Sequence, residues 1–414
     1  MGTLMRHRDF LKLWFGQTVS EFGSQVTTVA LPLTAAIFLR ADAAQMGILG
    51  ALATVPFLVM SLLAGVYIDR LPRRPLLITA DVARFVLLAA IPLLWLVHRL
   101  SIVDLYVIQF LIGCMTVLFD LAYQSYLPSL ISREMLVEGN GKLETTRAAS
   151  QVAGPGLGSV LVQLFAAPAA LAADALSYGV SVGSLLAIRT REEVPLQNTE
   201  RHVWREIGEG LRFVFANRLL WSLAGCTGTS NFFSSLTGAV YVLYFIHGLH
   251  FRGAMVGVVF GVGAVGGLVG AVAASRITEK LGLGAALVSA ITLSAAVQFL
   301  VPLAPAHSPV AMGMLIVAEL CTFFGSVVYN INQVSLRQAI TPDRLLGRMN
   351  ASIRFLIWGT MPLGSLAGGL LGSWIGLHAT LWVGVVGGMG AVVWLLTSPV
   401  SRLAEAPPAL EAGA

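Results

Sequence analysis

The stretch Gly65-Val-Tyr-Ile-Asp-Arg-Leu-Pro-Arg-Arg74 interrupts an otherwise apolar part of the chain. An apolar run long enough to cross a bilayer, which takes roughly 20 residues, precedes it, and another follows directly. Asp69, Arg70, Arg73 and Arg74 therefore lie in a very short connection between two predicted membrane spans. Basic residues in short loops stay on the cytoplasmic side of a membrane. We therefore expect this connection to face the cytoplasm and to set the orientation of the protein.

The composition of the whole chain is that of a membrane protein. Of 414 residues, 56% are hydrophobic and only 11% are charged, whereas soluble proteins average about 25% charged residues. The apolar runs are too long for strands and lack alternation, so we predict an all-α fold. The net charge of +5 fits cytoplasmic loops facing anionic lipid and does not require a nucleic-acid partner.

Twelve segments satisfy the length needed for a membrane-spanning helix. The predicted spans are 10–39, 46–68, 75–97, 103–131, 142–164, 168–188, 219–246, 254–275, 283–303, 309–338, 349–372 and 376–397. They predict a six-helix bundle over 1–188, a cytoplasmic linker over 189–218, a second six-helix bundle over 219–398 and a cytoplasmic tail over 399–414. Within the linker, apolar residues recur at three- and four-residue spacing from Val203 to Phe215, which predicts an amphipathic helix on the cytoplasmic face.

The distribution of basic residues sets the expected topology. The N-terminal residues are basic, and the apolar run from about Leu13 to Leu39 is too long for a signal peptide. Most of the 26 Lys and Arg residues fall in segments that are cytoplasmic if the N-terminus is inside. We therefore expect a multi-pass protein of the cell membrane, inner or plasma, with both termini in the cytoplasm.

The two halves also resemble each other. Asp69 and Arg70 correspond to Ser275 and Arg276, each pair at the inner end of a predicted span. Likewise, Arg147 and Pro155 correspond to Arg354 and Pro362. Weak internal repeats in a chain divided six plus six are typical of secondary transporters, so we predict a pseudo-symmetric arrangement of two bundles.

The Gly65–Arg74 spacing resembles the loop between helices 2 and 3 of the major facilitator superfamily (MFS), except that Pro72 stands where the family usually has glycine. The resemblance implies that Gly65, Asp69, Arg70, Arg73 and Arg74 form a conformational latch for the outward-open state. Three further stretches, Arg8–Gly23, Phe119–Gln163 and the DALSYGVS sequence from Asp174, resemble MFS exporters related to enterobactin and macrolide efflux proteins, the drug:proton antiporter branch.

The sequence Gly154-Pro155-Gly156-Leu157-Gly158 resembles the GPxxG signature of MFS antiporters. Proline removes a backbone hydrogen bond and bends a helix, while glycines allow a neighbouring helix to approach closely. The antiporter families use this motif as a flexible, leak-tight contact. Ordinary tight packing of two helices would explain the same residues, so only the position of the motif favours export.

Charged residues inside predicted spans are the candidates for coupling, because they are costly in hydrocarbon. Glu21 shares one helix face with Gln17 and Gln25, and a desolvated carboxyl favours its protonated form. We therefore predict that Glu21 carries the transported proton. Asp120 is the main alternative for the proton site, and Glu319 is a further one. The predicted substrate cavity also includes Arg147 and Arg354.

Other intramembrane charges have simpler explanations. Asp81 and Arg84 are three residues apart and are expected to neutralise each other on one helix. Asp174 is expected to cap a helix or to bond to its neighbours. Asp120 could pair with Arg147 or form a charge relay with Arg73, and both alternatives stay open.

These features predict a secondary active transporter that works by alternating access and exports small amphipathic organic molecules, such as drugs, antibiotics or siderophore-like compounds. We expect export to be coupled to proton influx. An MFS uptake permease or a flippase for lipid-linked molecules with the same fold is the alternative. No nucleotide-binding GxxxxGK[ST] stretch, hydrolytic motif or paired metal ligands occur in the sequence. We therefore expect neither an enzyme nor a metal or other cofactor, and we expect the protein to act as a monomer.

Overall fold

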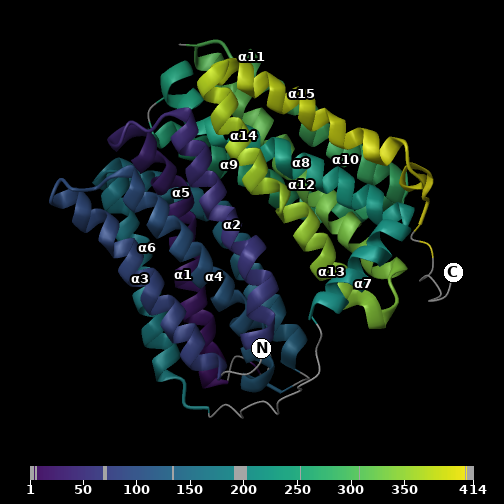
Figure 1. Cartoon of the computed structure of the whole chain (residues 1–414), viewed down its shortest axis with the longest axis horizontal. Helices are drawn as coiled ribbons and strands as arrows, with labels where there is room; N and C mark the ends of the chain where they lie inside the picture. The colour runs from purple at the N-terminus through teal and green to yellow at the C-terminus, as the bar shows by residue number, and fades with distance from the viewer. Residues whose placement is uncertain are drawn as a thin grey trace. The chain divides into compact units, whose positions relative to one another are not determined.

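The computed structural model describes residues 4, 7–68, 72–132, 135–190, 203–251, 253–306, 308–405 and 407. Over these ranges the regular secondary structure is helical (Figure 1). The first half contains α1 (Arg8–Leu33), η2 (Thr34–Phe38), α2 (Ala43–Ile68), α3 (Arg73–Leu96), α4 (Ile102–Leu130), α5 (Leu136–Phe165) and α6 (Ala167–Ala187). The second half contains α7 (Val203–Ala216), α8 (Arg218–Leu243), η4 (Tyr244–Gly248), α9 (Gly253–Leu281), α10 (Leu283–Val297), α11 (Leu300–Leu303), α12 (Pro309–Ile340), α13 (Asp343–Trp358), α14 (Thr360–Trp374), α15 (Leu377–Leu396) and η5 (Pro399–Arg402).

Each predicted span coincides with one of these helices or with two consecutive ones. Nine helical segments among the described residues are long and apolar enough to cross a membrane, which confirms a polytopic helical membrane protein. The number twelve stays a prediction, because α1, α5 and α8 are not among the nine. These three helices have the more polar sequences, and α1 and α5 carry Glu21 and Arg147.

The chain divides into two compact units. Unit 1 comprises Met1–Ala41, Leu52–Arg201 and Arg252–Val258. Within it, α1 packs against α5 and α6, and α3 packs against α4 and α6. The core of this unit includes the fully buried side chains of Phe10 and Leu77 together with Tyr126. Buried residues of α1, α3, α4 and α6 form this core. Because α6 packs against both α1 and α3, polar side chains of these three helices lie in the same bundle.

Unit 2 comprises Asp42–Ala51, His202–Phe251 and Val259–Ala414. Here α8 packs against α14 and α15, and α10 packs against α12. A Cβ atom added at Gly364 or Gly368 would overlap a backbone carbonyl of α8, at Phe232 and Leu236 respectively. The glycines of α14 therefore bring two helix backbones into direct contact.

The predicted amphipathic helix of the linker is α7, but it is more than a helix lying on a membrane surface. It packs against α13 and α8 inside unit 2, and the side chain of Val214 is fully buried in the core of that unit. Gly210 permits this approach, because a Cβ atom there would lie 2.5 Å from the Arg348 carbonyl oxygen. The division of the chain at 188, 218 and 398 stays a prediction.

Local conformations repeat between the two halves. The helices α1 and α8 both end in a short π-helical turn, η2 and η4. Each turn is followed by a residue with positive φ, Arg40 (φ 53°) after η2 and His250 (φ 57°) after η4. Non-glycine residues seldom adopt this conformation, so its occurrence at matching positions supports the internal repeat inferred from sequence.

Candidate transport site

Three of the predicted cavity residues come together in unit 1. The side chain of Glu21 on α1 is partly buried, and Arg147 of α5 and Asp120 of α4 lie close enough to influence its charge. Arg84 of α3 acts on it from a further direction. Asp120 and Arg147 are both exposed. The structure thus brings Asp120 and Arg147, both predicted as cavity members, into the surroundings of the α1 stripe.

The glycine–proline motif of α5 packs directly on this stripe. A Cβ atom at Gly154 would overlap the side chain of Gln25, and one at Gly158 would lie 3.1 Å from the Val26 Cα atom. Pro155 lies between these glycines and is buried, and its carbonyl accepts a hydrogen bond of 2.7 Å from the Ser159 hydroxyl. The motif therefore fixes the distance between α5 and α1 beside Glu21. Gln17, one turn earlier on α1, is buried, at 8% exposure.

A second polar cluster in unit 1 is buried, and its centre is Arg84. Its guanidinium forms an ion pair with Asp81 and lies between two rings, 4.3 Å from the centroid of Phe119 and 4.5 Å from that of Tyr178. Ser181 donates a hydrogen bond of 2.6 Å to the same aspartate. The predicted neutralising pair is therefore present, and α3, α4 and α6 all contribute to enclosing it.

Asp174 of α6 completes this buried cluster. Its carboxylate accepts hydrogen bonds from Thr27 and, at 3.0 Å, from Ser177. The adjacent Tyr178 hydroxyl shares a hydrogen bond of 2.9 Å with Ser24. Asp174 therefore bonds to its neighbours, as predicted, and ties α6 to α1.

Glu319 of α12 occupies a different environment in unit 2. It is only 5% exposed, and its Oε1 atom accepts a hydrogen bond from the Tyr241 hydroxyl and a longer one of 3.5 Å from Gln298. The Tyr241 ring is surrounded by further aromatic rings, with centroids 4.5 Å from that of Phe245 and 5.9 Å from that of Phe260. Within the described ranges, Glu319 forms no ion pair.

Arg354 of α13 does not join the Glu319 group. Its guanidinium lies 4.8 Å from the centroid of the Trp358 ring, and its charge acts on Arg337. In the same unit, Asn231 of α8 donates a hydrogen bond of 3.0 Å to the Ile357 carbonyl, beside the break between α13 and α14. The cavity residues predicted in the second half therefore lie in separate environments.

The predicted latch is described only in part. Asp69 and Arg70 lie outside the described residues, and Gly65 lies in the last turn of α2. Arg73 begins α3. Arg74 donates hydrogen bonds of 3.0 Å each to the carbonyls of Leu185 and Leu186. Arg74 thus binds the C-terminal end of α6, where carbonyl groups lack partners within the helix.

Two residues of the N-terminus bind the same end of α6, and sequence analysis missed both. Lys12 donates a hydrogen bond of 2.7 Å to the Ala187 carbonyl, while Asp9 accepts hydrogen bonds from the backbone and side chain of Thr190 and from Lys12. Burial raises the pKa of Asp9, but these hydrogen bonds outweigh it and leave the pKa below its ordinary value. We refer to Asp9, Lys12 and Arg74 as the α6 clamp.

This arrangement defines a class: a polytopic helical membrane protein with polar clusters inside each of two bundles and no enzyme-like constellation among the described residues. The chain belongs to the Major Facilitator Superfamily, whose family model matches residues 13–359. It is therefore a membrane transporter rather than an enzyme.

The relatives of the chain are named as efflux pumps. It is 26% identical over 397 residues to the multidrug efflux pump Tap of Mycolicibacterium fortuitum, covering 91% of this chain and 92% of the relative. A Tap protein of Mycobacterium tuberculosis is 26% identical over 379 residues, covering 88% and 87%. These matches confirm the resemblance to MFS drug exporters.

Solved structures share the fold at lower identity. A bacterial homologue of the iron transporter ferroportin in its inward-facing state matches with a TM-score of 0.75 and 16% identity, covering 96% of this chain and 99% of that one. The nucleoside transporter NupG matches with a TM-score of 0.71 and 12% identity, covering 94% and 98%. Their cargoes differ, so these likenesses support the fold alone.

Proposed function

We propose that this protein exports small amphipathic organic molecules, with proton influx as the driving force. The names of its relatives support export of drug-like molecules. A single structural observation supports coupling to protons. Glu319 is a deeply buried carboxyl, and its polar contacts are the Tyr241 phenol and the Gln298 amide. An intramembrane carboxyl in such surroundings favours its neutral form and can release its proton when water reaches it.

The structure supports Glu319 over Glu21 as the first candidate for the proton site. No Lys or Arg of α1 lies within one helical turn of Glu21, but Arg147 and Arg84 approach it from other helices. These arginines and Asp120 make the surroundings of Glu21 charged, whereas Glu319 has uncharged polar neighbours. Acidic side chains beside exposed polar groups suit recognition of a positively charged substrate, so we assign Glu21 and Asp120 to substrate binding.

The orientation remains part of this proposal. The positive-inside distribution supports a cytoplasmic location for the Gly65–Arg74 connection, the linker and both termini, in a protein of the inner or plasma membrane. Asp69 would then latch the outward-open state. Replacing Asp69 with Asn should reduce transport while leaving the protein folded, because a few kcal/mol shift a two-state equilibrium from one side to the other.

The test uses proteoliposomes with an imposed pH gradient and a fluorescent amphipathic cation such as ethidium. In the Glu319→Gln variant, gradient-driven transport should fall by about tenfold or more, which corresponds to about 1.4 kcal/mol. Exchange of the dye without a gradient should persist, since glutamine resembles the protonated acid. The matched Glu21→Gln variant should instead weaken dye binding and slow both kinds of transport.

Full gradient-driven transport by Glu319→Gln would return the proton site to Glu21 or Asp120. The same assay on Glu21→Gln and Asp120→Asn would decide between those two. If all three variants retain the response to the gradient, proton coupling through these carboxyls is wrong. Substrate accumulation in cells that express the protein, lowered by a protonophore, would instead favour an uptake permease.

A further inference from the structure

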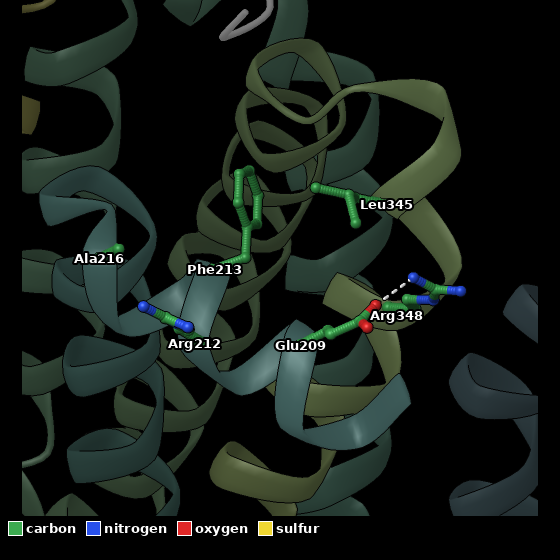
Figure 2. A pocket seen from close by; sticks show the side chains of 6 residues that line it. All are labelled: Glu209, Arg212, Phe213, Ala216, Leu345 and Arg348. Carbon is green, nitrogen blue, oxygen red and sulfur yellow. Dashed lines mark hydrogen bonds and ion pairs between the residues drawn. The ribbon is translucent and has the colours of Figure 1, made fainter. Parts of the chain in front are cut away.

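The end of unit 2 formed by α7 and α13 contains an open pocket of about 530 Å³ (Figure 2). Glu209, Arg212, Phe213 and Ala216 of α7 line it, together with Leu345 and Arg348 of α13. None of these residues belongs to the candidate transport site. We propose that this pocket binds the phosphate-bearing headgroup of an anionic phospholipid.

The charges of the pocket favour an anion. Arg348 forms an ion pair with Glu209, as Figure 2 shows. Arg212 is exposed and has no acidic or hydrogen-bonding partner among the described residues. Among the residues that line the pocket, two carry a guanidinium group and one carries a carboxylate. Guanidinium groups are suited to phosphate because their planar donors can bind two oxygen atoms at once.

The backbone of α13 adds to this preference. Leu345 and Arg348 lie in the first two turns of that helix. The N-terminus of a helix carries partial positive charge, which stabilises a nearby anion. This contribution supports the two arginines and would not define a site without them.

The apolar surroundings indicate a lipid rather than a free ion. Phe213, Leu345 and Ala216 give the pocket apolar walls. One turn beyond Arg212, an aromatic cluster continues to the surface: the centroids of Phe215 and Trp221 lie 4.8 Å apart, and those of Trp221 and Trp394 lie 5.6 Å apart. Trp221 is exposed whereas Trp394 is half-buried, and exposed tryptophans mark the level of the headgroups in membrane proteins.

The ion pair between Glu209 and Arg348 predicts whether each substitution strengthens or weakens lipid binding. A bound phosphate would compete with the Glu209 carboxylate for the Arg348 guanidinium. Removing that carboxylate should therefore strengthen binding, whereas removing the charge of Arg212 should weaken it. Basic pockets at the ends of membrane-spanning helices bind anionic headgroups in this manner.

The test measures lipid binding by the full-length protein in detergent micelles, with native mass spectrometry and added phosphatidylglycerol or phosphatidylcholine. Wild-type protein should retain phosphatidylglycerol preferentially. Arg212→Gln should weaken retention about fivefold, the equivalent of the roughly 1 kcal/mol that one basic residue contributes near a membrane surface. Arg212→Lys should retain most of the binding, and Glu209→Gln should bind more tightly than wild type.

Arg276→Gln is the matched control, because Arg276 is an exposed arginine of unit 2 with no hydrogen bond or ion pair among the described residues. Its phosphatidylglycerol binding should equal that of wild type. Equal loss in Arg276→Gln and Arg212→Gln would overturn the proposal, as would equal retention of the two lipids. Displacement of the lipid by millimolar glycerol 1-phosphate would indicate a site for a free phosphate ester and would also overturn it. Thermal unfolding of each variant separates loss of the site from loss of the fold.

Discussion

Glu21 and Glu319 are both carboxyls on membrane helices, yet their surroundings differ in kind. Glu21 is partly buried near Asp120 and Arg147, which are both exposed. Glu319 is almost fully buried and receives its hydrogen bonds from Tyr241 and Gln298. Burial, neighbouring charges and hydrogen-bond donors from other helices together determine how readily an intramembrane carboxyl ionises, so an intramembrane position alone does not define a proton site.

The largest expected effect separates the two arginines near Glu21. Replacing Arg84 with Gln should lower the free energy of unfolding by about 3–5 kcal/mol, because it leaves Asp81 charged and buried without its ion-pair partner. Replacing the exposed Arg147 with Gln should change stability by less than about 0.5 kcal/mol. Thermal unfolding in detergent measures both. Similar losses of stability in the two variants would mean that Arg147 also supports the fold. The surroundings of Glu21 would then differ less from the buried surroundings of Glu319.

The next effect concerns the hydroxyl group that holds Glu319. Tyr241→Phe leaves the aromatic packing and removes one donor from a buried carboxyl, which should cost about 1–3 kcal/mol. The optimum pH of gradient-driven transport should shift as well, because the hydroxyl no longer stabilises the carboxylate. Tyr244→Phe is the control, since its ring belongs to the same helical region but contacts His378. An unchanged pH profile in Tyr241→Phe would argue against Glu319 as the proton site.

A smaller effect is expected at the α6 clamp, whose charged side chains belong neither to the surroundings of Glu21 nor to those of Glu319. Arg74→Gln removes two hydrogen bonds to carbonyl oxygens and should lower stability by about 1 kcal/mol. The response of transport to the pH gradient should be unaltered. A selective loss of that response would instead connect Arg74 with the conformational latch.

The smallest effect is the pH dependence of Asp9. Its pKa is lower in the folded protein than in the unfolded chain, so its contribution is complete above the ordinary value of about 4 and is lost as the pH falls through the folded pKa. Asp9→Asn should therefore destabilise the protein by less than about 1 kcal/mol at neutral pH. At strongly acidic pH the difference should vanish. A difference that grows on acidification would contradict this assignment.

Much of the fold was predictable, because membrane helices must satisfy their backbone hydrogen bonds internally and therefore appear as long apolar runs. The Asp81–Arg84 pair was also predictable, since its residues lie three apart on one helix. The environment of Glu319 was not, because Tyr241 and Gln298 come from other helices. Sequence alone does not determine which face of α8 turns toward α12, and the α6 clamp was missed for the same reason.

The position of Arg84 between the Phe119 and Tyr178 rings has a consequence for how this sequence can vary. A lysine would keep the charge but lacks the planar guanidinium group that lies near both rings, and loss of either ring would remove one of these two contacts. In a deep mutational scan scored for the amount of folded protein, these three positions and Asp81 should therefore tolerate fewer substitutions than the exposed Asp120 and Arg147. Paired changes should rescue single ones there, as expected for residues that share one contact network.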